Sequence, residues 1–128
     1  MNPKHQNSLE NFKKAIEALK EALSLPIQTA RDRAGVIQSF EFTYEMSWKA
    51  LKRYLEHAGH EAQTARDAFR KAYSLGFIED EQAWLGMIED RNLTSHTYDQ
   101  EIADEVIARV RGYVPCYEKL LKNIGPLS

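Results

Sequence analysis

Apolar residues recur along the chain at intervals of three and four, and no stretch alternates apolar and polar residues. A spacing of three and four places apolar side chains on one face of an α-helix, whereas a half-buried strand would need alternation. Prolines occur only at positions 3, 26, 115 and 126, so long stretches run without a helix breaker. The pattern therefore predicts an all-α fold.

The first helix is expected to begin at Asn7, whose spacing from Glu10 fits a capping box, and to end before Pro26. A second, longer helix is expected from Asp32, as its N-cap, to the residue before Gly59. The apolar stripes of these two helices comprise Leu9, Phe12, Ile16, Leu19 and Leu23 in the first, and Val36, Ile37, Phe40, Tyr44, Trp48, Leu51 and Leu55 in the second.

The other flanks of the second predicted helix differ in character. Glu41 and Glu45 lie one turn apart on a narrow polar face, which we interpret as solvated, with Glu45 paired to Lys49. Phe42 and Met46 form a second apolar patch on another flank. A helix that is apolar on two flanks contacts more than one neighbour, in its own bundle or in a partner chain.

Three further helices follow from the same periodicity. A short helix is expected between an N-cap near Thr64 and Gly76, and the next begins at the N-cap Asp80. The last begins near Asp99 with an acidic first turn and continues past Pro115, where a kink is expected. Because short connections favour antiparallel neighbours, residues 1–128 are predicted to form a single domain, an up-and-down four-helix bundle with an additional short helix.

Composition narrows the classes of function. The chain has 128 residues and a formal net charge of -2, so it lacks the overall basic excess of a sequence-independent nucleic-acid binder. Cys116 is the only cysteine, which excludes an intramolecular disulfide and a cysteine zinc cluster, and we expect its side chain to be buried. No signal peptide or membrane-spanning run is present, which indicates a cytoplasmic protein without a membrane partner. His5 is expected in a frayed N-terminus.

The densest run of polar groups lies between the last two predicted helices, at residues 90–99. On a continuing helix, Asn92 and His96 share a face, so that Asn92 could fix the imidazole tautomer. Arg91 and Tyr98 share another face, with Ser95 nearby. Arg91 and His96 themselves diverge by roughly 140° on a straight helix. They can act on one phosphate only if the helix bends or if two copies combine, so we expect a homodimer.

These groups suit metal-independent cleavage of a phosphodiester. A histidine can remove a proton from an RNA 2′-hydroxyl or protonate the leaving oxygen, while an arginine stabilises charge on the phosphate. The alternative is a surface histidine beside an arginine paired with Asp90 or Asp99. His57 and His60 flank a helix end and are assigned to capping rather than to a metal, and no metal or cofactor site is expected.

Arg91, His96 and Tyr98 also reproduce the spacing of the R-x4-H-x-Y motif of the HepT branch of the HEPN superfamily, and the chain resembles that family. The runs QSFEFTYEMSWKALKRYLEHAG and GFIEDEQAWLGMIEDRNLTSHTYD further resemble proteins described as nucleotidyltransferase substrate-binding. The similarity covers nearly the whole chain.

The resemblance implies a dimeric helical toxin paired with a minimal nucleotidyltransferase antitoxin. It implies that Arg91 and His96 cleave RNA without a metal, and that the partner transfers AMP to Tyr98. Asn92 and Ser95 would support the site. Two other interpretations remain open: a non-catalytic substrate-binding subunit of the nucleotidyltransferase, and a plain helical interaction module.

Overall fold

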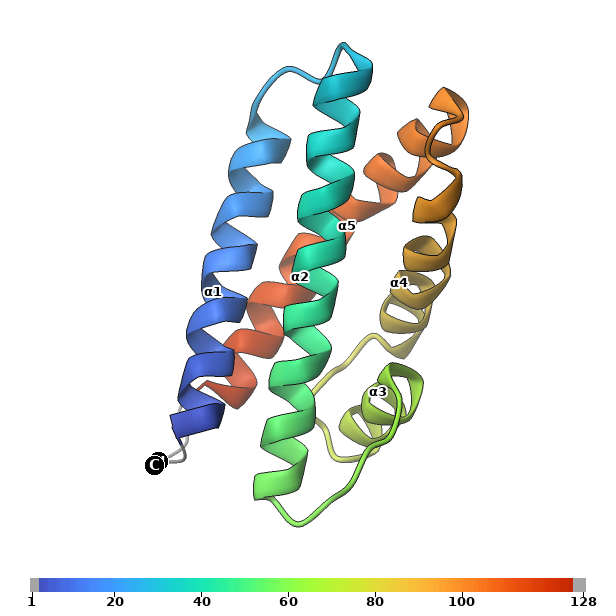
Figure 1. Ribbon diagram of the computed structural model, residues 1–128. Helices are drawn as coiled ribbons and strands as arrows, with labels where there is room; N and C mark the ends of the chain where they lie inside the picture. The colour runs from blue at the N-terminus through green and yellow to red at the C-terminus, as the bar shows by residue number, and fades with distance from the viewer. Residues whose placement is uncertain (1–2, 126–128) are drawn as a thin grey trace.

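The computed structural model describes residues 3–125, and side chains from His5 onward. Within this range the chain contains helices and no strand, which confirms the all-α prediction (Figure 1). The helices are α1 (Pro3–Ser24), α2 (Ala30–His57), α3 (Ala65–Ser74), α4 (Glu81–Leu93), the single 3-10 turn η1 (Thr94–His96) and α5 (Gln100–Ile124). The ends of the predicted domain, residues 1–2 and 126–128, lie outside the described residues.

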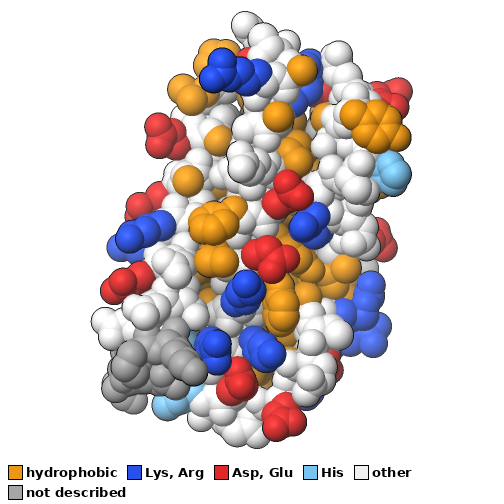
Figure 2. Space-filling model, in the orientation of Figure 1, with side chains coloured by type: hydrophobic (Ala, Val, Ile, Leu, Met, Phe, Trp, Pro, Cys, Tyr) orange, Lys and Arg blue, Asp and Glu red, His pale blue; other side chains and the backbone are white. Residues whose placement is uncertain are grey.

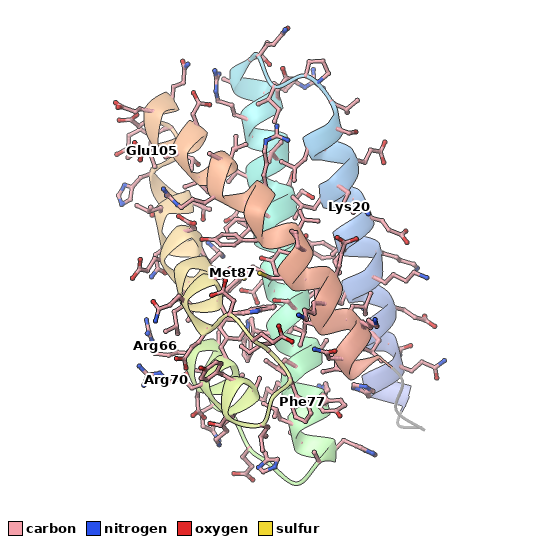
Figure 3. All side chains as sticks on the ribbon, turned by 180° about the vertical axis from the view of Figure 1, so that it is seen from behind. Lys20, Arg66, Arg70, Phe77, Met87 and Glu105 are labelled. Carbon is pink, nitrogen blue, oxygen red and sulfur yellow. The ribbon has the colours of Figure 1, made fainter. Side chains whose placement is uncertain are left out.

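Four long helices and one short one form a bundle. Helices α1 and α2 run antiparallel side by side, and α5 crosses obliquely behind them, as Figure 1 and the reverse view in Figure 3 show. Helices α3 and α4 pack on α2, and α4 also packs on α5. The predicted helical bundle with an additional short helix is therefore confirmed. None of the described helices is long and apolar enough to cross a lipid bilayer.

The predicted apolar stripes meet in one core. Trp84 of α4 lies at its centre, with its ring 4.9 Å from Phe69 of α3 and 5.6 Å from Tyr117 of α5. Burying a side chain of this kind stabilises the fold by roughly 1.5–3 kcal/mol. Cys116 lies at the edge of the core, only partly buried, and burial raises the pKa of its thiol. Other fully buried members are Phe12, Leu19, Phe40, Leu51, Leu55, Met87, Leu120 and Ile124.

The first helix begins earlier than predicted. It starts at Pro3, so Asn7 lies within α1 and is not its N-cap. Proline suits the first turn of a helix because its fixed φ matches the helical value and its missing N–H needs no partner there. The capping spacing at Asn7 was therefore a misleading signal.

The N-cap of α2 was also misassigned by three residues. Thr29 is the cap: its hydroxyl accepts from the backbone N–H of Asp32 at 3.1 Å, and the Asp32 carboxylate accepts from the Thr29 N–H at 3.0 Å. Asp32 is thus the acidic partner within a capping box. The predicted caps Thr64 and Asp80 are confirmed, since the side chain of each accepts a backbone N–H of the helix that follows it. Asp99, expected in the first turn of the last helix, is the N-cap of α5.

The early start of α1 buries His5, which contradicts the expected frayed terminus. Its side chain is 0% exposed, and its ring lies 5.9 Å from that of Tyr54 on α2. Burial lowers the pKa of His5, and the positive charge of His57 lowers it further. The polar backbone at Ile124 raises the pKa and offsets part of this shift. The imidazole is therefore packed as a neutral group that holds the start of α1 against the bundle.

This burial makes stability depend on pH. Because the folded-state pKa is depressed, the unfolded state takes up the proton first as pH falls below the ordinary histidine pKa of about 6.5. We expect the free energy of unfolding, measured with urea, to fall between pH 7.5 and 5.5 more steeply for the wild type than for His5→Leu. The partly exposed His60, changed to Leu, is the control. Equal pH dependence in wild type and His5→Leu would contradict the assignment.

Candidate functional site

The polar segment 90–99 does not form one continuous helix. Helix α4 ends at Leu93, the 3-10 turn occupies Thr94–His96, and α5 begins at Gln100 after the N-cap Asp99. A 3-10 helix has three residues per turn, whereas an α-helix has 3.6, so side chains point in different directions after the change. The change of helix type therefore falls between the two halves of the predicted motif.

This turn overturns the expected contact between Asn92 and His96. The Asn92 carboxamide is exposed and makes no hydrogen bond to the imidazole within the part of the chain that is described. Instead the Ser95 hydroxyl donates to the backbone oxygen of Asn92 at 3.0 Å and holds the turn. Ser95 thus supports the local backbone, and the structure assigns no tautomer-fixing role to Asn92.

Arg91 is held by two polar side chains. Its Nη1 donates to the Thr94 hydroxyl at 2.9 Å and lies 3.0 Å from Oε2 of Glu41 on α2. The Thr94 hydroxyl has two acceptors in reach, the backbone oxygen of Arg91 at 2.6 Å and Glu41 Oε2 at 3.1 Å. Both contacts of the guanidinium use Nη1, and the buried Nε has no hydrogen-bond partner. Nη2 also has none among the described residues, and the Arg91 side chain as a whole is 39% exposed.

Glu41 was therefore misinterpreted as part of a solvated face. Because α4 packs against α2, the Glu41 side chain is 34% exposed and its carboxylate is paired with Arg91. Glu45 accepts from the indole N–H of Trp48 at 3.3 Å, and its expected ion pair with Lys49 is not formed in the described structure. Figure 2 shows acidic, basic and hydrophobic side chains interleaved on the side of the molecule seen in Figure 1. Of the second apolar patch predicted on another flank of α2, Met46 packs against the core and Phe42 is 51% exposed.

His96 and Tyr98 are exposed at the end of the bundle. Their ring centroids are 6.1 Å apart in an edge-to-face arrangement, and Tyr98 is 86% exposed. Tyr98 also lines a surface hollow of about 460 Å³ between the first turns of α2 and α5, with Arg33 and Ile37 on its α2 side. A tyrosine so exposed is open to an enzyme that modifies it.

Asp90 has partners that the sequence did not indicate. Its buried carboxylate accepts from Nη2 of Arg109 at 2.7 Å, from Nε of Arg109 at 2.9 Å, and from the Tyr113 hydroxyl at 2.6 Å. The hydrogen bond to Asp90 raises the pKa of Arg109, and burial with the same carboxylate raises that of Tyr113. This network fixes α4 on α5 directly beside Arg91. It also excludes the alternative in which Asp90 pairs with Arg91.

The structure thus brings the motif residues together in two pairs rather than in one cluster. Arg91 lies with Glu41 and Thr94, and His96 lies with Tyr98. No hydrogen bond, ion pair or ring contact joins Arg91 to His96 in the described residues. Arg91 and His96 therefore make no direct contact within one chain.

Comparison with known proteins places the chain in a family. A "probable ribonuclease HepT" from Haemophilus influenzae is 41% identical over 86 residues, covering 63% of this chain and 59% of the relative. The match thus spans under two thirds of that protein. A crystal structure of a Thermus thermophilus protein superposes with a TM-score of 0.84 at 35% identity, over 90% of this chain and 99% of the other.

A third relative supports the fold alone. The tri-AMPylated HEPN toxin of Shewanella oneidensis, solved in complex with its MNT antitoxin, has a TM-score of 0.80 at 18% identity, over 98% of both chains. The model of the family described as "nucleotidyltransferase substrate binding protein like" matches residues 7–125. The resemblance to HepT-type and nucleotidyltransferase substrate-binding proteins is therefore confirmed, and the chain belongs to the nucleotidyltransferase substrate binding protein-like family.

Proposed function

We propose that this protein is a HepT-type toxin, a metal-independent endoribonuclease that acts on cytoplasmic RNA. The observation that carries the proposal is the state of Arg91. Glu41 and Thr94 hold its guanidinium through Nη1 while Nη2 makes no hydrogen bond among the described residues, and the exposed His96 follows five residues later at the end of the 3-10 turn. A fixed cation and a free imidazole that act on the same phosphate are the minimum equipment for cleavage by the RNA 2′-hydroxyl.

In this mechanism the 2′-hydroxyl loses its proton to a base, and its oxygen attacks the adjacent phosphorus. The bond from phosphorus to the 5′-oxygen breaks, and that oxygen takes a proton from an acid. The products are a 2′,3′-cyclic phosphate and a 5′-hydroxyl. His96 acts as the base or the acid, and Arg91 Nη2 stabilises the charge on the non-bridging oxygens.

The separation of Arg91 from His96 favours a homodimer with a composite site. One copy supplies the arginine and the other the histidine, so a phosphate lies between two chains. Phe42, on another flank of α2, is an exposed apolar side chain that a second copy would cover.

The cognate minimal nucleotidyltransferase is the proposed antitoxin, and it transfers AMP to Tyr98. The exposure of Tyr98 and the AMPylation of the Shewanella oneidensis toxin support this step. Added phosphates beside His96 would repel the RNA backbone and crowd the site. Modification at this tyrosine would therefore switch cleavage off.

The test is incubation of the purified protein with RNA in EDTA, beside an Arg91→Ala/His96→Ala double variant. We expect the wild type to leave cyclic phosphate ends and the double variant to leave the RNA intact. Treatment with the nucleotidyltransferase and ATP should silence the wild type but not Tyr98→Phe. Equal cleavage by wild type and double variant would contradict the proposal.

The second candidate is a non-catalytic subunit that presents a substrate to the nucleotidyltransferase. The family description and the net charge of -2 favour it. If this second function is correct, the wild type forms a stable complex with the nucleotidyltransferase and cleaves no RNA under any condition. The same assay therefore separates the two functions.

A further inference from the structure

The outer face of α3 carries two arginines and a tyrosine in one stripe. Arg66, Arg70 and Tyr73 are spaced four and three residues apart, which places them within about 60° of each other around the helix. All three are exposed, while Ala68, Phe69 and Ala72 of the same helix are buried. In Figure 3 the labelled side chains of Arg66 and Arg70 project beside each other from the outer edge of α3.

Neither arginine is neutralised. No carboxylate lies within ion-pair distance of Arg66 or Arg70 in the described structure, whereas Arg33, Arg91 and Arg109 each have one. Two like charges four residues apart destabilise a helix slightly rather than supporting it. The pair therefore has no structural role that would explain it, in a chain whose net charge is -2.

One ring contact relates α3 to the helix whose Glu41 holds Arg91. Tyr44 of α2 packs edge-to-face on Phe69 of α3 with ring centroids 6.2 Å apart, and it lies one turn beyond Glu41, the partner of Arg91. Burial raises the pKa of Tyr44, and the charges of Arg91 and Arg66 both oppose that rise. Tyr44 thus contacts α3 on one side of α2 and lies one turn from the ion pair of Arg91, which relates the start of α3 to the candidate site.

We propose that the face formed by Arg66, Arg70 and Tyr73 binds single-stranded RNA on one side of the scissile phosphate. The two guanidinium groups contact successive backbone phosphates, and the half-exposed ring of Tyr73 stacks on a base. Unpaired cations combined with an exposed aromatic ring in one stripe match the way single strands are bound without sequence readout. RNA as the ligand rests on the proposed function, and the location of the binding face is the new element.

The test measures RNA binding without cleavage, in His96→Ala protein, by titrating a labelled 12-nucleotide single strand at several salt concentrations. The salt slope is the magnitude of the change in the logarithm of the binding constant per unit logarithm of salt concentration. Each lost phosphate contact lowers this slope by about 0.7 for a single strand, so Arg66→Ala/Arg70→Ala should lower it by about 1.4. At 0.1 M salt the same loss weakens binding about 25-fold. Lys13→Ala/Lys14→Ala, which removes equal charge from an exposed part of α1, is the matched control and should leave the slope unchanged.

Tyr73 gives an independent readout, because a neutral ring contributes stacking but no counterion release. Tyr73→Ala should weaken RNA binding about 10-fold with an unchanged salt slope. Tyr73→Phe should bind RNA as tightly as the parent protein. A merely structural effect would not separate affinity from slope in this way.

Equal affinity and slope for the parent protein and Arg66→Ala/Arg70→Ala would overturn the proposal. Unchanged RNA binding together with loss of dimerisation or of nucleotidyltransferase binding would overturn it as well, and would assign α3 to a protein partner. Absence of cleavage by the wild type, with the expected shift in RNA binding, would instead refute the ribonuclease function and leave the binding face standing.

Discussion

Replacing His96 by alanine should lower the rate of RNA cleavage by about 100- to 10,000-fold, the range for loss of a general acid or base. The imidazole is exposed at the end of the 3-10 turn, and its ring contact in the described structure is with Tyr98. It is thus free to exchange a proton with RNA. The rate is measured under single-turnover conditions, with enzyme in excess.

The matched control for this prediction is His60→Ala. His60 lies in the loop after α2 and carries the same chemical group away from the motif. Its loss should leave the rate unchanged. If His96→Ala cleaved RNA within about twofold of the wild-type rate, His96 could not be the proton-transfer group, because such a group contributes far more than that.

The largest effect on stability is expected from Arg109. Its removal would leave the Asp90 carboxylate, which is 2% exposed, with Tyr113 as its one remaining side-chain partner. The Arg109 side chain is itself 44% exposed, so solvent screens part of the pair, and loss of a partner from a buried acceptor costs about 1–3 kcal/mol. Arg109→Ala should therefore lower the free energy of unfolding by about that amount, as measured by urea denaturation.

Two comparisons sharpen this prediction. Arg111 is exposed and lies two residues further along α5. Changing it to alanine should lower the free energy of unfolding by less than about 0.5 kcal/mol. Adding Asp90→Asn to Arg109→Ala should recover part of the loss, because the buried charge is then removed as well. Additive losses in the double variant would show that the two residues do not act as a pair.

The fold followed from the sequence because its determinants are local. Helical periodicity identified the stripes that become the core, and the caps Thr64, Asp80 and Asp99 are side chains that bond within their own first turn. The two errors at helix starts, Asn7 and Asp32, have the same origin. Each is a polar residue near a helix start, and a spacing rule does not distinguish the cap from a residue inside the helix.

The candidate site was only partly accessible to the same reasoning. Arg91, His96 and Tyr98 lie within eight consecutive residues, so spacing and resemblance were enough to select them. Glu41 lies 50 positions before Arg91 in sequence, and nothing in the polar stripe of its own helix indicates which neighbouring helix it faces. The contact between Asn92 and His96 failed because the 3-10 turn replaced the helix on which it depended.

The most direct measurement compares wild-type cleavage of one short RNA, in EDTA, with cleavage of the same strand carrying a 2′-deoxyribose at the cleaved position. Our account expects the RNA to be cut to a 2′,3′-cyclic phosphate and the 2′-deoxy strand to stay intact, since the 2′-oxygen is the nucleophile. Cleavage of both strands, or of neither, would contradict it.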